Sequence, residues 1–481
     1  MYRNMMKVLG LMIVAGLLLS ACVTAAPEPE KVVEKVVETV VETVEKEVIK
    51  EVEVPVEAEP VEKAVVEFGG FYPSDSAWGR MYRMLGYRFE AENPDCQFLY
   101  SEYPGVAGAD ALKLRAQEGD PVSMAGGGIG SETTAAEIKL HWESGMFYDL
   151  ADVMAGPAYG QEGVPWLETF TEGAQTFMVT EGGRIGTIPY QQTQIVLWIN
   201  QNIYSDLGLT VPTTWSELLA NCEVLAKNNI ACVGGGGFSG YIGYWYDMIL
   251  FRLLGADKFL ALYQNLDPEI RWDNTPEVLV AAEMLDDLIV KGYTSDGFVG
   301  GDFTAEQVAF FTDRSAHLFV GTWLVGEMAD SIPEGFEMSV AYFPTVDGYE
   351  DVSPYESAFG FLNGWTIYGA QDEHTLDCTV RYAKLLTSAE VMEEITSGDY
   401  LDFQTTIIGG QGPSGVPGIG DLLAVQKLWF PATGGIGAAA PEARSAYWEN
   451  LETFASGLMT AEEFAQRMAE DWVEIFSRIE K

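Results

Sequence analysis

The residues of this chain that could catalyse a reaction are mainly acidic. Three neighbouring pairs, Asp286-Asp287, Glu393-Glu394 and Glu462-Glu463, could be interpreted as the two carboxylates of a glycosidase. However, the chain contains 72 acidic residues, so such pairs arise by chance, and each pair lies on a helix face that we expect to be solvated. Neither Gly-x-Ser-x-Gly nor His-Glu-x-x-His occurs. We therefore expect a protein that is not an enzyme.

Signals for a cofactor or a metal are also weak. Gly235-x-Gly237-x-x-Gly240 follows a predicted strand at 230–233 and formally matches the dinucleotide fingerprint, with Asp257 about twenty residues further on. Because the N-terminal residues described below predict export, where NAD is scarce, we interpret these glycines as a turn. His141, His317 and His374 are isolated and no Cys-x-x-Cys occurs. We expect neither a cofactor nor a metal.

Other residues are suited to binding. Tyr241, Tyr244 and Trp245 follow a glycine run at spacings of three and four, which predicts one side of a helix, where packing in the core is the alternative to ligand contact. Ser74 and Asp75 follow the first predicted strand, at the end of a strand where open α/β sheets bind ligands. A second glycine run holds two further candidates, Gly127 and Gly128. Each is a candidate binding residue.

Strands alternate with helices along the chain. Apolar runs predict strands at 64–68, 96–100, 195–199 and 230–233, and apolar residues at helical spacing predict helices at 78–92, 109–118, 241–254 and 375–386. Thr214 is expected to cap the helix that begins at Trp215, with Glu217 completing a capping box. This alternation predicts doubly wound α/β structure.

Composition limits the partners. The formal net charge of −45 repels nucleic acid and anionic lipid, so we expect neither as a partner. The part of the chain after residue 63 is long enough for two or more lobes rather than one core. No second apolar run of about eighteen residues follows the N-terminal one, so any membrane contact is expected through lipid alone.

The N-terminus predicts export and anchoring. Residues 1–21 have a basic start, an apolar run and small residues, which is typical of a signal peptide. Leu19-Ser20-Ala21-Cys22 resembles a bacterial lipobox, which implies lipidation of Cys22. Residues 22–63 form a Val/Glu-rich, low-complexity segment, interpreted as a lipid-anchored stalk that is either extended or helical. We expect an exported protein held at a bacterial membrane.

Four cysteines remain besides Cys22. Export permits disulfides, and four thiols allow three pairings. Cys222 and Cys232 lie ten residues apart on a predicted helix and the following strand, and Cys96 and Cys378 would then pair at long range. Four buried free thiols are the alternative.

Several short motifs occur in an order that resembles a known family. Ile188-Pro189-Tyr190 and a strand that ends at Asn200 precede Pro212-Thr213-Thr214-Trp215-Ser216-Glu217-Leu218. Gly321-Thr322-Trp323, Phe343-Pro344 and Gly364-Trp365-Thr366-Ile367 follow. In order and spacing these are similar to the extracellular solute-binding proteins of ABC importers, in the group that includes maltodextrin-binding protein, over residues 64–481. The chain departs from that pattern at Val122, where Asp is usual, and at His317, where Met is usual.

The resemblance implies a two-lobed, periplasmic-binding-protein-like fold of type II with the ligand between two α/β lobes. By position, lobe 1 would comprise 64–192 and 358–407, and lobe 2 would comprise 193–357 and 408–481. Cys96 and Cys378 would then share lobe 1, and Cys222 and Cys232 would share lobe 2. Both pairings are favoured because neither would join the two moving lobes.

The resemblance also implies site residues. Trp323 matches a position where an aromatic ring stacks on the ligand, and Trp365 lies near a predicted crossing between lobes. Gln192, Thr193 and Gln194 lie at the first crossing, and neutral amides suit hydroxyl groups better than charges. Sugars need such aromatic surfaces together with short polar groups.

We therefore expect a monomeric, lipid-anchored binding protein that captures a sugar or oligosaccharide by lobe closure and delivers it to an ABC permease. A binding protein for a polyamine or another cationic solute is the alternative, since acidic and aromatic residues also suit ammonium groups. A secreted carbohydrate-active enzyme is a further alternative.

Overall fold

A computed structural model describes residues 63–126, 146–178, 183–236, 239–397 and most of 401–479, with 402, 413, 418, 421, 423–425 and 437–439 excepted. The expected signal peptide, Cys22, the stalk, Gly127, Gly128 and His141 lie outside the described residues. None of the described helices combines the length and the apolar character needed to cross a membrane.

The main sheet has nine strands in the order β2-β1-β3-β10-β6-β8-β7, with β11 paired to β10 and β9 paired to β6. Its strands are β1 (Ala64–Gly70), β2 (Cys96–Glu102), β3 (Met124–Gly126), β6 (Ile188–Asn200), β7 (Ala231–Gly234), β8 (Ser315–Gly321), β9 (Met338–Ala341), β10 (Ser357–Ile367) and β11 (Leu428–Pro431). A separate hairpin joins β4 (Pro157–Ala158) to β5 (Gln161–Pro165). Pairs β1–β2, β1–β3 and β7–β8 are parallel, as expected for α/β structure.

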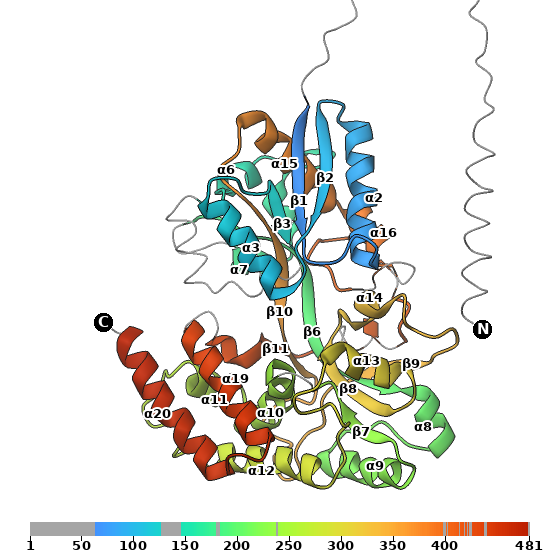
Figure 1. Ribbon diagram of the computed structural model, residues 1–481, viewed down its shortest axis with the longest axis vertical. Helices are drawn as coiled ribbons and strands as arrows, with labels where there is room; N and C mark the ends of the chain where they lie inside the picture. Colours follow the sequence, from blue (N-terminus) through green and yellow to red (C-terminus); the bar gives the residue numbers. More distant parts are fainter. Residues whose placement is uncertain are drawn as a thin grey trace, which may run out of the picture. The chain divides into compact units, whose positions relative to one another are not determined.

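Two large clusters of buried apolar side chains define two lobes. The elements around Phe68, Tyr82 and Tyr382 are called lobe 1, and those around Leu197 and Phe319 are called lobe 2. The long antiparallel strands β6 and β10 contribute side chains to both clusters and run from one group of elements into the other (Figure 1). The fold is therefore two-lobed and mixed α/β, whereas the residue boundaries of the lobes remain a prediction.

The helices of lobe 1 cover both faces of its part of the sheet. They are α2 (Ala77–Glu92), α3 (Gly105–Gln117), α6 (Ala151–Met154), α7 (Glu172–Met178), α15 (Glu373–Leu386) and α16 (Ala389–Ile395), with a 3₁₀ turn η1 (Trp166–Thr169). The hydroxyl of Ser76 caps α2 by accepting from the N–H of Gly79 at 3.1 Å, and the Asp372 carboxylate caps α15. The predictions for helix 78–92 and strand 96–100 are confirmed.

Lobe 2 contains more helices. They are α8 (Gln201–Leu207), α9 (Trp215–Lys227), α10 (Ser239–Leu254), α11 (Ala256–Tyr263), α12 (Pro276–Val290), α13 (Phe303–Phe311), α14 (Leu324–Met328), α19 (Pro441–Ala455) and α20 (Ala461–Ile479), with a 3₁₀ turn η2 (Ala432–Gly435). The predicted capping box of α9 is present, with Thr214 and Glu217 bonded in both directions.

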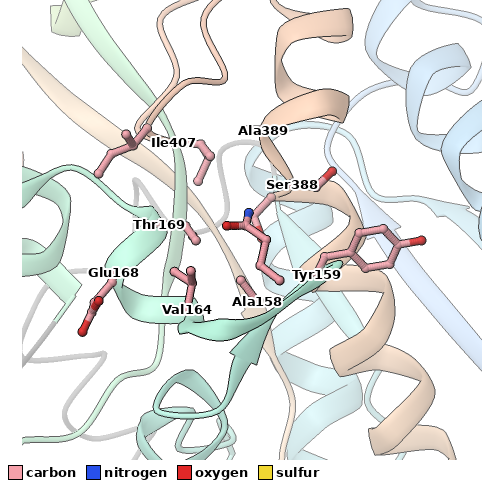
Figure 2. Close-up of a pocket in the computed structure, with 11 residues that line it drawn as sticks. Ala158, Tyr159, Val164, Glu168, Thr169, Ser388, Ala389 and Ile407 are labelled. Carbon is pink, nitrogen blue, oxygen red and sulfur yellow. The ribbon is translucent and has the colours of Figure 1, made fainter.

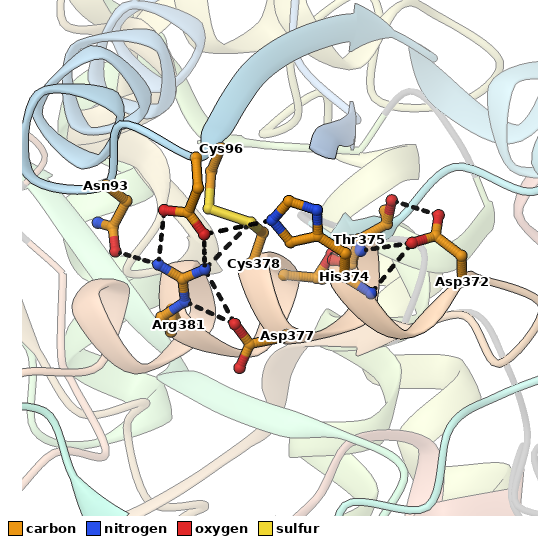
Figure 3. A network of polar contacts seen from close by, with 10 residues as sticks. Asn93, Cys96, Asp372, His374, Thr375, Asp377, Cys378 and Arg381 are labelled. Carbon is orange, nitrogen blue, oxygen red and sulfur yellow. Dashed lines mark hydrogen bonds and ion pairs between the residues drawn. A yellow bond between two sulfur atoms is a disulfide. The ribbon is translucent and has the colours of Figure 1, made fainter. Parts of the chain in front are cut away.

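Both expected cysteine pairs are disulfides in the structure, Cys96–Cys378 and Cys222–Cys232. Figure 3 shows the first of them beside a polar network in which Arg381 donates to Asp95 at 2.6 Å and His374 lies 3.2 Å from the same carboxylate. The hydrogen bond from Arg381 holds the pKa of Asp95 well below its usual range. Asp95, Cys96 and Cys378 are also grouped closely enough to suggest a metal site, but the two sulfur atoms are bonded to each other.

The histidine that departs from the family pattern is a core residue. His317 is fully buried on β8, where Nδ1 lies 2.7 Å from the carbonyl oxygen of Cys232 and Nε2 contacts the hydroxyl of Tyr204. Burial lowers the pKa of His317 to about 4, so the ring is neutral at pH 7. Hydrogen bonds at both nitrogens explain how an imidazole is accommodated inside lobe 2.

Candidate functional site

A partly exposed group of aromatic rings surrounds Trp323 in lobe 2. The Trp323 ring lies 5.7 Å from the Phe361 ring of β10 and 6.4 Å from the Tyr241 ring of α10. Tyr241 in turn stacks on Phe303 of α13, with ring centroids 3.6 Å apart and planes nearly parallel. All four rings are half-buried, so each keeps some surface free. We call Tyr241, Phe303, Trp323 and Phe361 the aromatic surface.

The position of Trp323 depends on the glycine at the end of β8. A Cβ atom on Gly321 would lie 1.8 Å from Cζ3 of Trp323, so no other residue fits there without moving the ring. The Gly-x-Trp motif therefore has a steric basis, because the glycine lets the indole lie over the end of its own strand.

A carboxylate lies next to the aromatic surface. Glu327 follows Trp323 by one helical turn, and its Oε2 accepts a hydrogen bond of 2.7 Å from Nε2 of Gln307. The Glu327 side chain is exposed, yet the surrounding protein raises its pKa by desolvation, as expected for a carboxylate in a recess. Gln307 is fully buried, and its Oε1 has no partner among the described residues. A buried unpaired amide oxygen costs about 1–3 kcal/mol, so this arrangement is not favoured by stability alone.

Two neutral amides lie close to the end of β8, where the chain continues into Trp323. Gln194 of β6 accepts the N–H of Thr322 at 2.9 Å through its carbonyl, and its side-chain Nε2 donates to Oε1 of Gln426 at 2.7 Å. Gln192 is half-buried, whereas Thr193 is fully buried and its hydroxyl accepts from Asn363 at 3.3 Å. The structure therefore brings Gln194 next to Thr322 and buries both Gln194, which is 2% exposed, and Thr193, which lies inside the crossing between β6 and β10.

The loop after β1 approaches the same region from lobe 1. The N–H of Ser74 donates to Glu102 at 2.8 Å, while the backbone carbonyl of Asp75 accepts from Arg80. Arg80 also forms an ion pair with Asp330, just beyond α14. In the same loop, Tyr72 is half-buried and stacks on Trp78 at 5.4 Å. Asp75 is thus linked through Arg80 to the segment that carries Trp323, whereas Ser74 is held by Glu102 of lobe 1.

The three acidic pairs that could suggest catalysis lie on three separate helices, α12, α16 and α20. Asp287 forms an ion pair with Lys291, Glu394 pairs with Arg88, and Glu463 accepts from the N–H of Thr460 at the start of α20. Such ion pairs and capping contacts are typical of helices at a protein surface. Each acidic pair lies on a different helix.

Comparison with known proteins identifies the family. The family model described as bacterial extracellular solute-binding protein matches residues 78–393, which is more than half of the chain. The chain belongs to this family.

Individual relatives of this solute-binding protein are distant. It is 25% identical over 190 residues to a probable sugar-binding periplasmic protein of Rhizobium meliloti (strain 1021), and the match covers 38% of this chain and 43% of that relative. The chain therefore spans less than half the length of the curated relative it matches.

Among solved structures, a chitin oligosaccharide binding protein has a TM-score of 0.70 at 20% identity, covering 86% of this chain and 99% of the other. The solute-binding protein RafE in complex with raffinose has a TM-score of 0.67 at 16% identity, covering 87% and 100%. At these identities the likeness shows the two-lobed fold.

Two of the candidate binding residues of this solute-binding protein are core residues instead. Trp365 and Trp245 are both 0% exposed. Trp365 stacks on Tyr190 at 4.1 Å inside lobe 1, and Trp245 packs between Phe319 and Phe343 inside lobe 2. For Trp245 the alternative of packing in the core therefore holds, because one residue beyond the half-buried Tyr244 the side chain is rotated about 100° toward the sheet.

Several residues at the site had not been singled out from the sequence: Tyr72, Phe303, Gln307, Glu327, Phe361 and Gln426. Glu327 lies four residues beyond Trp323, at the spacing of one turn of α14, so a helical reading of this segment could have found it. Gln426 could not, because 232 residues separate it from Gln194. Only the folded chain brings such residues together.

Two cavities lie away from the aromatic surface. Figure 2 shows the smaller, about 190 Å³, in lobe 1 between the β4–β5 hairpin and the start of α16, with Tyr159, Glu168 and Ser388 in its wall. The larger, about 880 Å³, lies between Arg271–Leu279 and α20. Neither is lined by a candidate binding residue, so neither alters the assignment of the site.

Proposed function

We propose that this solute-binding protein captures a sugar or oligosaccharide and passes it to an ABC permease, without performing chemistry on it. The observation that carries the proposal is the half-buried aromatic surface around Trp323 with the exposed carboxylate of Glu327 at its edge. Aromatic rings bind the apolar C–H faces of sugars, and amide and carboxylate groups bind the surrounding hydroxyls. The names of the similar proteins, a probable sugar-binding protein, a chitin oligosaccharide binding protein and a raffinose-bound protein, agree with this ligand class.

The proposed mechanism is a change in lobe arrangement. The aromatic surface belongs to lobe 2, while Tyr72, Ser74 and Asp75 belong to lobe 1. A ligand that contacts both favours the arrangement in which the lobes are closed around it, since it can shift an equilibrium only by its differential affinity. In this proposal the protein acts as a monomer, and the permease recognises the closed arrangement.

Anchoring by lipid at Cys22 is part of the same proposal. The lipobox-like sequence and the stalk support it, because a tether would keep the receptor near its transporter. Labelling of the cells with a radioactive fatty acid should label the wild-type protein and leave Cys22→Ala unlabelled. Equal labelling of the two proteins would exclude this anchor.

The test of sugar binding is a titration of the intrinsic tryptophan fluorescence with raffinose and with a chitin oligosaccharide. We expect a saturable change with at least one of them, and we expect Trp323→Ala to weaken that binding by about 100-fold or more, as for the loss of a central aromatic anchor. Trp448→Ala is the matched control, since Trp448 is a half-buried ring of lobe 2 on α19. If Trp323→Ala and Trp448→Ala titrate alike, Trp323 does not contact the ligand.

Spermidine, titrated in the same way, tests the cationic alternative. The exposed carboxylate of Glu327 beside aromatic rings is the observation that favours it, since this combination also suits ammonium groups. Saturable binding of spermidine without binding of either sugar would replace the proposed ligand class.

A further inference from the structure

The carboxylate of Glu327 is held in place rather than free to move. The N–H of Glu327 donates to the carbonyl of Trp323 at 2.9 Å, which places the two side chains one turn apart on α14. The buried amide of Gln307 then binds Oε2 at 2.7 Å. This donor from α13 therefore fixes the direction in which the carboxylate faces.

The fixed carboxylate keeps capacity to accept further hydrogen bonds. An ionised carboxylate has about four lone-pair sites, and the Gln307 amide uses one of them. The Glu327 side chain is exposed, so solvent or a ligand can reach the remaining sites. Its hydrogen-bond donor, the Gln307 amide, is uncharged, so this contact is not an ion pair.

Glu327 also lies where α14 meets lobe 1. A Cβ on the adjacent Gly326 would lie 2.8 Å from the carbonyl oxygen of Leu401, which shows how closely this helix approaches lobe 1. Tyr72 of lobe 1 is near enough for the Glu327 charge to act on its hydroxyl. A group bound by Glu327 is therefore within reach of lobe 1 as well as of the aromatic surface.

We propose that Glu327 is a specificity-determining residue, whose carboxylate accepts hydrogen bonds from two adjacent hydroxyls of a sugar ring that lies against Trp323, with Gln307 as its positioning residue. The inference rests on the proposed sugar-binding function and identifies the Glu327 carboxylate as the group that recognises the sugar hydroxyls. Hydroxyls are favoured over ammonium groups because the side chain that positions Glu327, Gln307, is a neutral amide, as are Gln194 next to Thr322 and its partner Gln426. A polyamine with several charges would need further carboxylates besides Glu327.

The test compares wild type, Glu327→Gln, Gln307→Leu and Glu283→Gln by calorimetric titration with raffinose, a chitin oligosaccharide and spermidine. Glu327→Gln keeps the shape but turns one acceptor into a donor, so we expect sugar binding to weaken by about 10- to 100-fold. Gln307→Leu should weaken it less, by about 3- to 10-fold, because the carboxylate remains but is no longer fixed. Glu283→Gln, the same charge change at an exposed position of α12, should bind as the wild type does.

The possible outcomes distinguish a failure of the role proposed for Glu327 from a failure of the proposed sugar-binding function. If the wild type binds a sugar and Glu327→Gln binds it equally well, the role of Glu327 is overturned while sugar binding stands. If only spermidine binds, and binding depends on Glu327, the carboxylate reads a cation and the proposal is wrong. If the wild type binds neither sugar, the proposed function fails and the inference falls with it. If the melting temperatures of the variants are unchanged, a loss of affinity is not caused by unfolding of the variant.

Discussion

Arg80 and Asp330 form a two-pronged ion pair, with Nη2 to Oδ1 at 3.0 Å and Nη1 to Oδ2 at 3.1 Å. Arg80 lies on α2 of lobe 1, and Asp330 lies just beyond α14 of lobe 2. The pair therefore joins the helix that carries Glu327 to the opposite lobe. Because both side chains are largely exposed, it contributes little to stability, but it can bias the position of α14.

Breaking this ion pair should loosen α14. In Arg80→Ala and in Asp330→Ala we expect faster amide hydrogen exchange over Leu324–Met328, with no further increase in the double variant, because both changes remove the same contact. Arg271→Ala is the control, since Arg271 pairs with Asp273 within lobe 2. Additive effects of the two single changes would show that the residues act independently.

The buried carboxyl of Asp247 should make stability depend on pH. It accepts from the hydroxyls of Tyr263 and Tyr447 on α11 and α19, and desolvation raises its pKa to about 7, so the folded state retains its proton where the unfolded chain has lost it. The free energy of unfolding contributed by Asp247 is therefore largest at acid pH. It should fall, by on the order of 2–4 kcal/mol, as pH rises from about 4 to about 7.

Asp247→Asn tests this dependence. The amide cannot titrate, so the difference in unfolding free energy between wild type and variant should change with pH across that window and stay constant above it. Denaturant unfolding at several pH values, with both disulfides intact, measures this difference. A difference that does not vary with pH would show that Asp247 titrates at its ordinary value.

The two disulfides should differ in their contribution to stability. Cys96 and Cys378 are separated by 282 residues, whereas Cys222 and Cys232 are separated by 10. On the chain-entropy model, replacing the first pair by alanine costs about 5 kcal/mol and replacing the second costs about 3 kcal/mol. Unfolding of the two double variants in denaturant measures both. A larger loss at Cys222–Cys232 would indicate that local strain or packing outweighs the entropy of the unfolded chain.

Local sequence patterns predicted most of the individual elements. The capping box at Thr214 and Glu217 needs only residues three apart, and the apolar spacing in 78–92 fixes which face of α2 is buried. Both are short-range properties, so they can be recognised before the chain is folded. The prediction for residues 109–118 was less accurate, since α3 begins at Gly105, where no side chain caps the helix and so no signal marks its start.

Burial was the property that local patterns predicted poorly. Trp323 and Trp365 both follow a glycine within two residues, yet Trp323 is half-buried on the aromatic surface and Trp365 is covered on all sides by lobe 1. The difference arises from what packs over each ring. Trp365 lies on β10 between Tyr190 and Tyr82, and these neighbours come from 175 to 283 residues away in the chain.

The sequence by itself determined the family, the alternation of strands and helices, and the aromatic and amide residues from which a sugar site could be built, because these are carried by residue types and short spacings. Only the tertiary structure decided which of these residues meet. It brought Gln307 to Glu327, Gln426 to Gln194 and Arg80 to Asp330, and it removed Trp245 and Trp365 from the site by covering them. The reason is physical: hydrogen bonding and burial depend on distances in space, which residues far apart in the chain acquire only when the two lobes form.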